Sequence, residues 1–421
     1  MTALAPSRPG RLQIRWRTLE CWAVGAALFF QSGAVSVLLF SGPDGDLTAG
    51  GRRMMQLLVL PVYLVTLLLA ARHPRQILAA VRGNLAVAVL LALPFASVLW
   101  SVSPTLTLRR AVGLLLSILL SYVIAVRFTP RQFMVLLVAV LGTSMVLSLG
   151  LALASPGLAF MPPGHEATGM RGIFHHKNVL GWNAAIAAIT AGALAADRSL
   201  GLRFLAVLVF AAAVACLLLS GSATALVMMA SGVFFVAFYM ALARSRPVGK
   251  ALLILTTVQV VALVVLSIDV LLGMLLDSTA KDVTLTGRVP LWNLVDEAIS
   301  RRFLLGYGYQ AFWTEGSGEA WNIWTLVGWM TPHAHNGFRD SMLSFGAAGT
   351  ILLLAVIARA LRSAAFLQCR YPKEGWLWLN VLICIFLVMN LTESMLLIQN
   401  NLFFILFMAA VIMASARRPD S

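Results

Sequence analysis

Apolar runs long enough to cross a membrane recur along the whole chain. A transmembrane helix needs about 20 mostly apolar residues. Transmembrane β-strands are disfavoured, because the runs are too long and do not alternate apolar with polar residues. The pattern therefore predicts an all-α polytopic integral membrane protein with about 12 transmembrane helices. The predicted spans are 19–40, 54–71, 84–100, 110–127, 133–154, 178–196, 203–219, 223–242, 250–273, 341–361, 376–390 and 395–414.

The composition favours one membrane domain over several soluble domains. Only 11% of the 421 residues are charged and 60% are hydrophobic, whereas soluble domains carry about 25% charged residues. We therefore expect residues 1–421 to form a single membrane domain. Two extracytoplasmic loops stand out within it: 155–177, which is rich in Pro and Gly, and 274–340, the longest polar insertion. The second loop, between the predicted ninth and tenth helices, contains an amphipathic segment at 288–302.

The distribution of basic residues predicts the orientation. If the N-terminus is cytoplasmic, roughly two thirds of the 31 Lys and Arg residues fall in inside segments, as the positive-inside rule requires. We therefore expect both termini in the cytoplasm. The net charge of +15 is read as a topology signal and an attraction to the anionic lipid bilayer, and no nucleic-acid partner is expected. The first apolar run lacks a clear cleavage site, which favours a retained helix over a signal peptide.

Cysteine and histidine placement bears on metals and disulfides. The four cysteines (Cys21, Cys216, Cys369 and Cys384) are scattered and form no CxxC motif, so neither a disulfide nor a cysteine metal site is expected. Five of the six histidines lie in the two outer loops: His165, His175, His176, His333 and His335. Zinc was considered for the paired histidines, but no acid or cysteine lies at a familiar ligand spacing. The expected metal content is none.

The segment RGIFHHKNVLGW at 171–182 places polar groups directly before the predicted sixth span. That helix would begin outside, with Asn178 as its N-cap. Free N–H groups at a helix N-terminus attract anions, and Arg171, His176 and Lys177 add positive charge. These residues predict a phosphate-binding site. The alternative is a simple cap with basic side chains that snorkel to the interface.

A second polar segment, TPHAHNGFRD at 331–340, precedes the predicted tenth span. His335 and Asn336 stand before another outward-facing helix start. A neutral histidine there could accept a proton from an attacking hydroxyl. The alternative is a solvated loop histidine.

Further candidates lie at other outer helix ends. Arg288 begins the amphipathic segment, and Arg109 with Arg110 lies near the outer start of the fourth span, where interfacial anchoring is the alternative. Glu393 in NLTESM could partner a basic residue, although a solvated turn is favoured. The sequon at Asn390 lies against a helix end and is discounted.

Several of these segments resemble a known family. The motifs RGxFxHKNxLG, TGRxxxW and HAHNGFRDSMLSFGAAG look like the O-antigen ligase and Wzy-type polymerase superfamily. The segments LWSVSPTLTLRR and NLTES are most similar to its ExoQ-like exopolysaccharide polymerases. The resemblance runs from about residue 97 to the last predicted helix.

The resemblance implies a glycosyltransferase of the bacterial inner membrane that acts at the periplasmic face without a metal or other cofactor. Its donor would be an oligosaccharide linked to undecaprenyl pyrophosphate. Its acceptor would be a glycan, or lipid A core in a ligase, with the polysaccharide export machinery as a further candidate partner. Arg171 and Arg288 would grip the pyrophosphate, and His335 would activate or orient the acceptor. The residues that would shape the binding site are His176, Lys177, Asn178, Asn336, Arg109 and Arg110.

One departure and one other class of protein bear on this expectation. In the resembling family many members have a basic residue after the seventh helix, where this chain has Ala223, so a phosphate contact from that hairpin is not expected on the strength of the resemblance. A polysaccharide or lipid-linked glycan transporter is the alternative from another class, but transporters place ionisable groups near the middle of the membrane. Here the charges gather at the outer ends of the spans. No P-loop or dinucleotide fingerprint is present.

Overall fold

The computed structural model describes residues 16–40, 50–51, 54, 57–162, 168–260, 263 and 288–416. These residues are helical apart from turns and loops, and an isolated antiparallel bridge joins Phe160 and Met170. The predicted all-α class is thereby confirmed. His165 and residues 274–287 lie outside the described residues, as do Arg8, Arg11, Arg15, Arg417 and Arg418 at the two termini.

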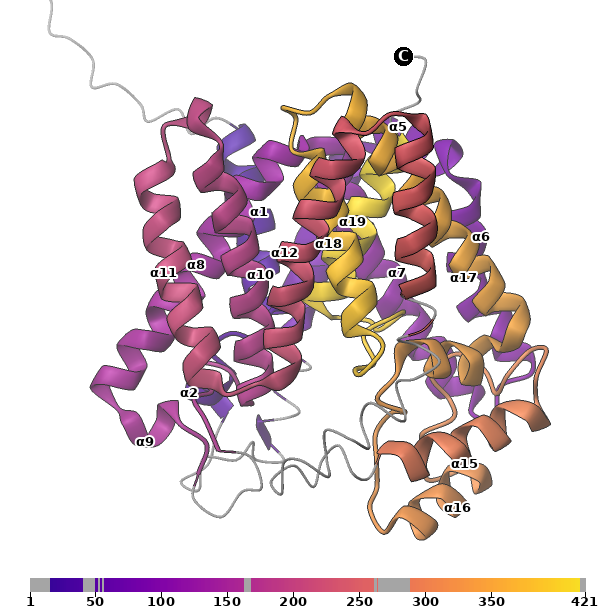
Figure 1. Cartoon of the computed structure of the whole chain (residues 1–421). Coiled ribbons are helices and arrows are strands. Elements are labelled where there is room, and N and C mark those ends of the chain that lie inside the picture. Colours follow the sequence, from indigo (N-terminus) through magenta and orange to yellow (C-terminus); the bar gives the residue numbers. More distant parts are fainter. Residues whose placement is uncertain are drawn as a thin grey trace, which may run out of the picture.

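Long helices run side by side through the height of the molecule (Figure 1). Six of them are long and apolar enough to cross a membrane: α7 (Pro104–Arg127), α8 (Pro130–Ala154), α10 (Lys177–Ala196), α11 (Arg203–Ser220), α12 (Ala223–Arg244) and α17 (Gly337–Arg370). Two further helices could together form a seventh span. They are α5 (Pro74–Gly83) and α6 (Leu85–Ala96), which continues into a 3-10 turn at Ser97–Leu99, and the bend between α5 and α6 is 96°. The protein is a multi-pass membrane protein by helix length and hydropathy.

Shorter helices complete the bundle. They are α1 (Trp16–Gln31), α2 (Ser36–Phe40), α4 (Val59–Arg72), α9 (Pro156–Ala159), α18 (Trp376–Met389), α19 (Leu402–Ala416) and the helix Pro247–Val260, with a 3-10 turn at Arg198–Leu200. Twelve spans were predicted from the sequence. Among the described residues, six helices, or seven with the bent pair, are long and apolar enough to cross a membrane, and the other helices are shorter. The predicted last span begins late, since residues 391–401 form an irregular loop before α19.

The centre of the bundle is formed by helices without a polar face. Almost every residue of α19 is buried, as expected for a helix that is apolar all round. Alanines at Ala184, Ala187, Ala188 and Ala191 let α10 pack closely against its neighbours. The exposed apolar side chains lie mainly on outer helices such as α11 and α12, where lipid would replace protein contacts.

Two helices from the predicted long loop form a separate hairpin at one end of the bundle. α15 (Arg288–Arg301) and α16 (Gly318–Val327) pack on each other through Leu291, Val295, Ala298 and Ile323. In Figure 1 they lie below α17 and project beyond the long helices. The predicted amphipathic helix at 288–302 is confirmed, whereas α16 was not anticipated.

A break inside α17 holds this hairpin in place. Gly346 adopts a φ of 61°, and the backbone of Leu304 and Leu305, in the turn after α15, packs directly against it. The N–H of Ala347 donates to the carbonyl of Phe303 (2.7 Å), and the N–H of Tyr307 donates to the carbonyl of Leu343 (2.7 Å). A left-handed residue without a side chain is required because a Cβ would lie 2.3 Å from the backbone of Leu304.

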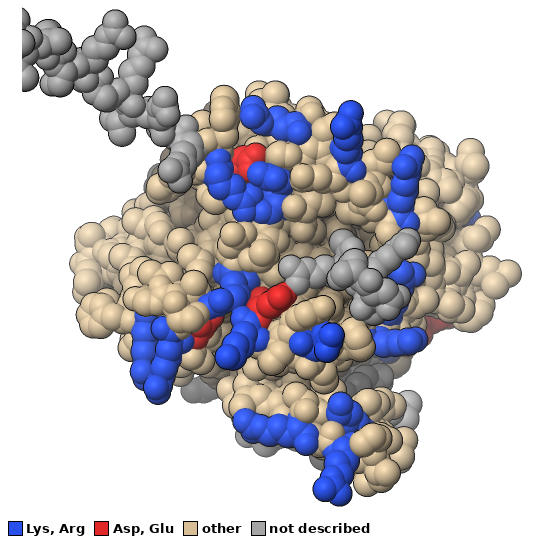
Figure 2. All heavy atoms as spheres, turned by 90° about the horizontal axis from the view of Figure 1, so that it is seen from above, with Lys and Arg blue, Asp and Glu red and all other residues tan. Residues whose placement is uncertain are grey.

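Basic side chains gather at the opposite end of the bundle. Figure 2 shows Lys and Arg spread over the upper face, where the C-terminus lies in Figure 1. The α15–α16 hairpin and the lower ends of α10 and α17 occupy the other end. The two ends therefore differ chemically, one basic and one carrying the loops singled out by the sequence.

Candidate functional site

The start of α17 is built around Asn336, which is the N-cap of this helix. Its side-chain oxygen accepts the backbone N–H groups of Phe338 and Arg339 at 3.1 Å each, and its amide nitrogen donates to the carbonyl of Leu391 (3.1 Å). These bonds commit both ends of the Asn336 amide. The next residue, the glycine of the HNG motif, has no room for a side chain: a Cβ at Gly337 would lie 2.2 Å from the Asn390 amide oxygen.

His335 is held in a strained conformation directly before this cap. Its φ is 52°, a left-handed value that costs a residue with a side chain on the order of 1–3 kcal/mol. The ring lies 4.2 Å from the His333 ring and 5.9 Å from the Trp329 ring, between centroids. Its Nδ1 lies 3.8 Å from Oε2 of Glu393, and the side chain keeps 20% exposure. Surroundings that maintain such strain frequently belong to functional sites.

Glu393 joins His335 to Arg288. One Arg288 nitrogen donates to the carbonyl of Thr392 (2.6 Å), and another lies 3.5 Å from Oε1 of Glu393. The two side chains are only 9% and 5% exposed. The solvated turn favoured for Glu393 is therefore wrong, and the alternative, a carboxylate that partners a basic residue, is what the structure contains. We call Arg288, His333, His335 and Glu393 the His335 cluster.

His333 supports the strained residue as a neutral ring. Its Nδ1 accepts the backbone N–H of His335 (3.2 Å), which leaves the proton on Nε2. Burial, together with the nearby His335 and Arg288, lowers the pKa of His333 to about 3. His333 is thus uncharged at neutral pH. Its Nδ1 can accept the N–H of His335, and the ring adds no positive charge to the cluster.

Asp340 anchors the loop from inside α17, although it was not among the predicted site residues. Its carboxylate accepts the Trp313 indole N–H (2.8 Å), the backbone N–H of Ala334 (3.1 Å) and the hydroxyl of Ser394. Ser394 in turn accepts the backbone N–H of Asn336 (3.0 Å). An acid in the first turn of a helix is an ordinary sequence signal, but its loop partners come from distant segments.

A small cavity of about 120 Å³ lies beside the cluster. Its lining includes Arg110, Gln310, His333, Asp340 and Leu397. Two of these residues, Gln310 and Leu397, also adopt positive φ values of 49° and 55°. Arg110 donates to the Gln310 carbonyl, so the structure connects this predicted residue with the His335 cluster, whereas Arg109 lies exposed on α7.

The α10 turn, residues 168–178, forms a second group. The N-cap of α10 is His176 and not Asn178: the His176 Nδ1 accepts the backbone N–H of Asn178 (3.1 Å), which leaves Asn178 inside the first helical turn. Arg171 is 1% exposed, and its Nε donates to the carbonyl of Leu158 (3.0 Å). Lys177 is the first residue of the helix.

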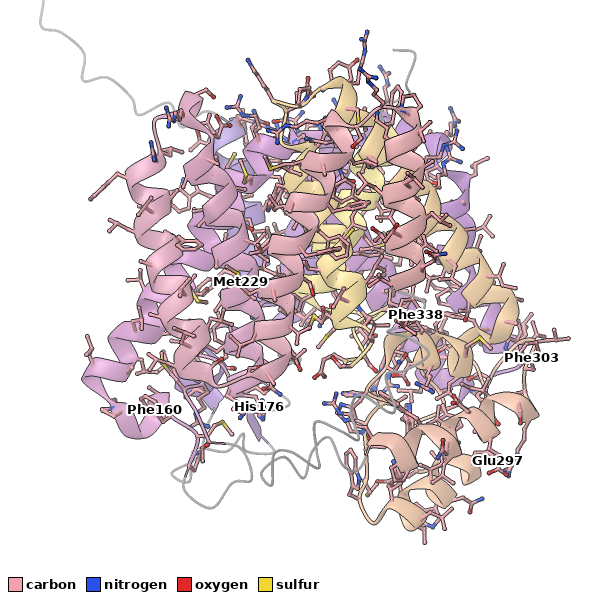
Figure 3. The ribbon with its side chains drawn as sticks, in the orientation of Figure 1. Phe160, His176, Met229, Glu297, Phe303 and Phe338 are labelled. Atoms are coloured by element: carbon pink, nitrogen blue, oxygen red, sulfur yellow. The ribbon has the colours of Figure 1, made fainter. Side chains whose placement is uncertain are left out.

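The structure does not join the two groups through a described contact or cavity. Figure 3 shows His176 at the lower end of α10 and Phe338 at the lower end of α17. Both groups thus belong to the same end of the molecule. Arg288, His333, His335, Asn336 and Arg110 are brought together, and Arg171, His176 and Lys177 form a separate turn.

An apolar groove of about 790 Å³ includes Asn336, the residue that follows His335, in its lining, whereas no member of the His335 cluster lines it. It runs between α12, the helix Pro247–Val260, α17 and α18, and its side chains are mainly aliphatic and aromatic. Polar residues lie at one end, where Asn336 and an ion pair between Arg339 and Asp296 (2.8 Å) line it. The lining residues are Phe235, Phe238, Tyr239, Ile254, Thr257, Val258, Asp296, Ile299, Asn336, Phe338, Arg339, Met342, Thr350, Leu354, Leu361, Cys384, Leu387, Val388 and Leu391.

Comparison with known proteins agrees with the resemblance seen in the motifs. Residues 206–354 match the family model described as O-antigen ligase, a stretch that contains Arg288, His335 and Asn336. The chain is also similar to the exopolysaccharide production protein ExoQ of Rhizobium meliloti (strain 1021), with 29% identity over 276 residues. The match covers 63% of this chain and 61% of ExoQ, so it spans less than two thirds of the relative's length.

Proposed function

Because residues 206–354 form an O-antigen ligase domain and the chain is a distant homologue of ExoQ, we propose that the protein is an inner-membrane glycosyltransferase. It transfers glycans from undecaprenyl pyrophosphate at the periplasmic face and polymerises exopolysaccharide repeat units. The observation that carries the proposal is the apolar groove whose lining includes Asn336, the residue that follows His335 of the cluster. A lipid-linked donor needs this combination, an apolar groove for its tail and polar groups for its head.

The groove suits the lipid part of the donor. A polyprenyl chain gains about 0.8 kcal/mol for each buried CH₂, so the donor stays in an apolar environment while it reacts. The groove is open between helices that carry exposed apolar side chains, such as Phe234 of α12 and Leu354 of α17. The tail can therefore enter from the bilayer and leave its pyrophosphate near Asn336 and Arg339.

The cluster supplies the chemistry of transfer. An acceptor hydroxyl oxygen forms the new bond to the anomeric carbon of the donor, and the bond from that carbon to the pyrophosphate oxygen breaks. The electron pair leaves with the lipid pyrophosphate, which Arg288 stabilises. The hydroxyl proton passes to His335; its Nδ1 is turned towards Glu393, so Nε2 is the nitrogen that accepts it.

Orientation follows from the two chemically different ends. We place the basic upper face of Figure 2 in the cytoplasm, with both termini, as the positive-inside rule requires. The His335 cluster then lies at the periplasmic face. Lys177 would add positive charge at that face, as predicted. Arg171 is buried with its Nε on the Leu158 carbonyl, and we assign it a structural role in place of the predicted contact with the pyrophosphate.

The decisive test is transfer by the purified full chain in detergent. We expect it to convert lipid-linked repeat units into longer lipid-linked chains without added nucleotide or metal. His335→Ala should lower the rate by about 10²–10⁴-fold, the usual contribution of a general base. If the wild-type protein only moved the lipids between leaflets of a vesicle, it would be a transporter and the proposal would be wrong.

The groove can be tested separately with two substitutions on one helix. Leu354 lines the groove, whereas Ile351 lies on the same helix, is 65% exposed and lines no described cavity. Leu354→Trp should raise the KM for the lipid-linked donor by about tenfold, equivalent to ~1.4 kcal/mol of lost binding. Ile351→Trp should leave the KM unchanged. Equal effects of both changes would show that the tail does not use the groove.

A ligase that transfers glycan to lipid A core is the second candidate, favoured by the description of the matching family model. The chemistry is the same and only the acceptor differs. A deletion strain distinguishes the two. Loss of long chains with single repeats retained indicates a polymerase, and accumulation of long lipid-linked chains that are not attached to lipid A indicates a ligase.

A further inference from the structure

A second groove, of about 550 Å³, lies on the α15–α16 hairpin and is separate from the lipid groove. Trp321 is 55% exposed on its wall. Its indole N–H donates to no residue that the structure describes. Three charged side chains, Glu297, Arg301 and Glu319, line the same groove together with Asn322. An exposed aromatic face beside carboxylate and amide groups is suited to a sugar, which offers an apolar ring face and hydroxyl groups.

The charged residues are fixed in place by mutual ion pairs. Arg301 lies between the two acids, 2.7 Å from Glu297 and 2.5 Å from Glu319. These pairs raise the pKa of the Arg301 guanidinium above its usual range. Two carboxylates against one guanidinium leave the groove with a net negative charge. It would therefore repel an acidic glycan and accept hydroxyl groups of a neutral one.

The position of the hairpin excludes the lipid tail as an occupant. Figure 1 shows α15 and α16 beyond the ends of the long helices, and Figure 3 shows Glu297 on the outer part of this hairpin. The exposed ion pairs belong in water, because charged groups are costly in the hydrocarbon region. A water-soluble ligand is thus favoured over a membrane surface.

A series of neighbouring indoles, one pair edge-to-face and one pair tilted, connects the groove with the loop before His335. The Trp321 ring lies 6.2 Å from the Trp324 ring, which lies 6.4 Å from the Trp313 ring. Trp313 donates to Asp340, the residue that anchors the loop before His335. The Trp324 indole N–H donates to the carbonyl of Thr331, at the start of that same loop (2.8 Å).

We infer that the groove between α15 and α16 binds a neutral segment of the growing glycan, away from its reacting end, with Trp321 stacked on a sugar ring. This inference rests on the proposed function, since it names where the growing chain is held during transfer. Binding there keeps a long glycan near the His335 cluster between additions. Single additions do not require the groove, but repeated additions do.

The test compares Trp321→Ala with Trp321→Phe and with Trp22→Ala, a control at an exposed tryptophan of α1. The probe is the neutral repeat-unit oligosaccharide released from the lipid by mild acid, observed by saturation-transfer NMR with the full chain in detergent. Trp321→Ala should weaken its binding about tenfold, as is typical for removal of an aromatic anchor. Trp321→Phe should retain most of the binding, and Trp22→Ala should retain all of it.

Product length provides the second measurement. Trp321→Ala should make shorter chains from lipid-linked repeat units while the first addition keeps its wild-type rate. Glu319→Gln and Asn322→Ala should shorten the chains as well, which covers the case that Trp321→Ala fails to fold. Unchanged binding and unchanged chain length in the folded variants would overturn the inference, as would equal binding of a carboxylated form of the oligosaccharide. Failure of the wild type to transfer at all would refute the proposed function, while the NMR signal would still report on the groove.

Discussion

The α10 turn and the start of α17 look alike in sequence but differ in structure. Each places a histidine, an asparagine and a basic residue at a helix start. At α17, the asparagine caps the helix and the preceding His335 is strained, beside a buried carboxylate and a cavity. At α10, the histidine itself is the cap, and Arg171 is buried with its Nε on a backbone carbonyl. The difference shows that a helix-start motif acquires chemistry only when distant residues reach it.

The largest combined effect on transfer and stability is expected at Arg288, the cation paired with the buried Glu393 of the α17 region. Arg288→Ala removes the pyrophosphate contact, and loss of one such donor typically costs about 10²–10³-fold in rate. It also leaves Glu393 as an uncompensated buried charge, which typically costs 3–5 kcal/mol. Transfer of lipid-linked repeat units and the thermal midpoint in detergent measure the two losses.

A double variant separates these losses. Arg288→Ala with Glu393→Gln removes both charges and should recover most of the thermal stability. Transfer should stay low, because the cation for the leaving group is still missing. Recovery of transfer together with stability would show that Arg288 only balances Glu393 and takes no part in the reaction.

A smaller effect, of a different kind, is expected in the α10 turn. Arg171→Ala leaves the Leu158 carbonyl without its donor, which typically costs about 1–3 kcal/mol for a buried group. Transfer should fall only as far as the folded population falls. The exposed Arg109→Ala is the control for stability and should change the thermal midpoint little, as surface substitutions usually do. Lost transfer at an unchanged midpoint would instead give Arg171 direct contact with the pyrophosphate, and the two regions would then be equivalent.

The smallest effect is a pH dependence of stability specific to the α17 region. The pKa of His333 is about 3 in the folded protein, against 6.5 for an unperturbed histidine. Below pH 6.5 the unfolded chain binds a proton that the folded chain refuses, so the stability from His333 is complete above pH 6.5 and declines as the pH falls towards 3. His333→Gln should therefore reduce the drop in thermal midpoint between pH 7 and pH 5. An unchanged pH profile in this variant would mean that His333 is not held neutral.

Much of the fold could be predicted because hydropathy acts locally. The run Leu379 to Phe386 or the run Phe403 to Met413 must be buried in protein or lipid whatever its neighbours are, so helices were expected at nearly the right places. The amphipathic period of α15 gave its boundaries to within a residue. Helix lengths were less predictable. Residues 395–398 are apolar and predict the start of the last span, but Asn390 ties them into a loop by accepting the backbone N–H groups of Met395 and Leu396.

The sequence by itself determined that the chain is helical, that it lies in a membrane and that histidines and arginines gather before the starts of α10 and α17. It also pointed to Arg288, His335 and Asn336. Only the tertiary structure decided that Glu393 and Asp340 complete the cluster and that Arg171 is buried elsewhere. The physical reason is sequence distance: the Arg288–Glu393 pair spans 105 positions and the Ser394–Asp340 bond spans 54, and local patterns carry no information about which loops meet when helices pack.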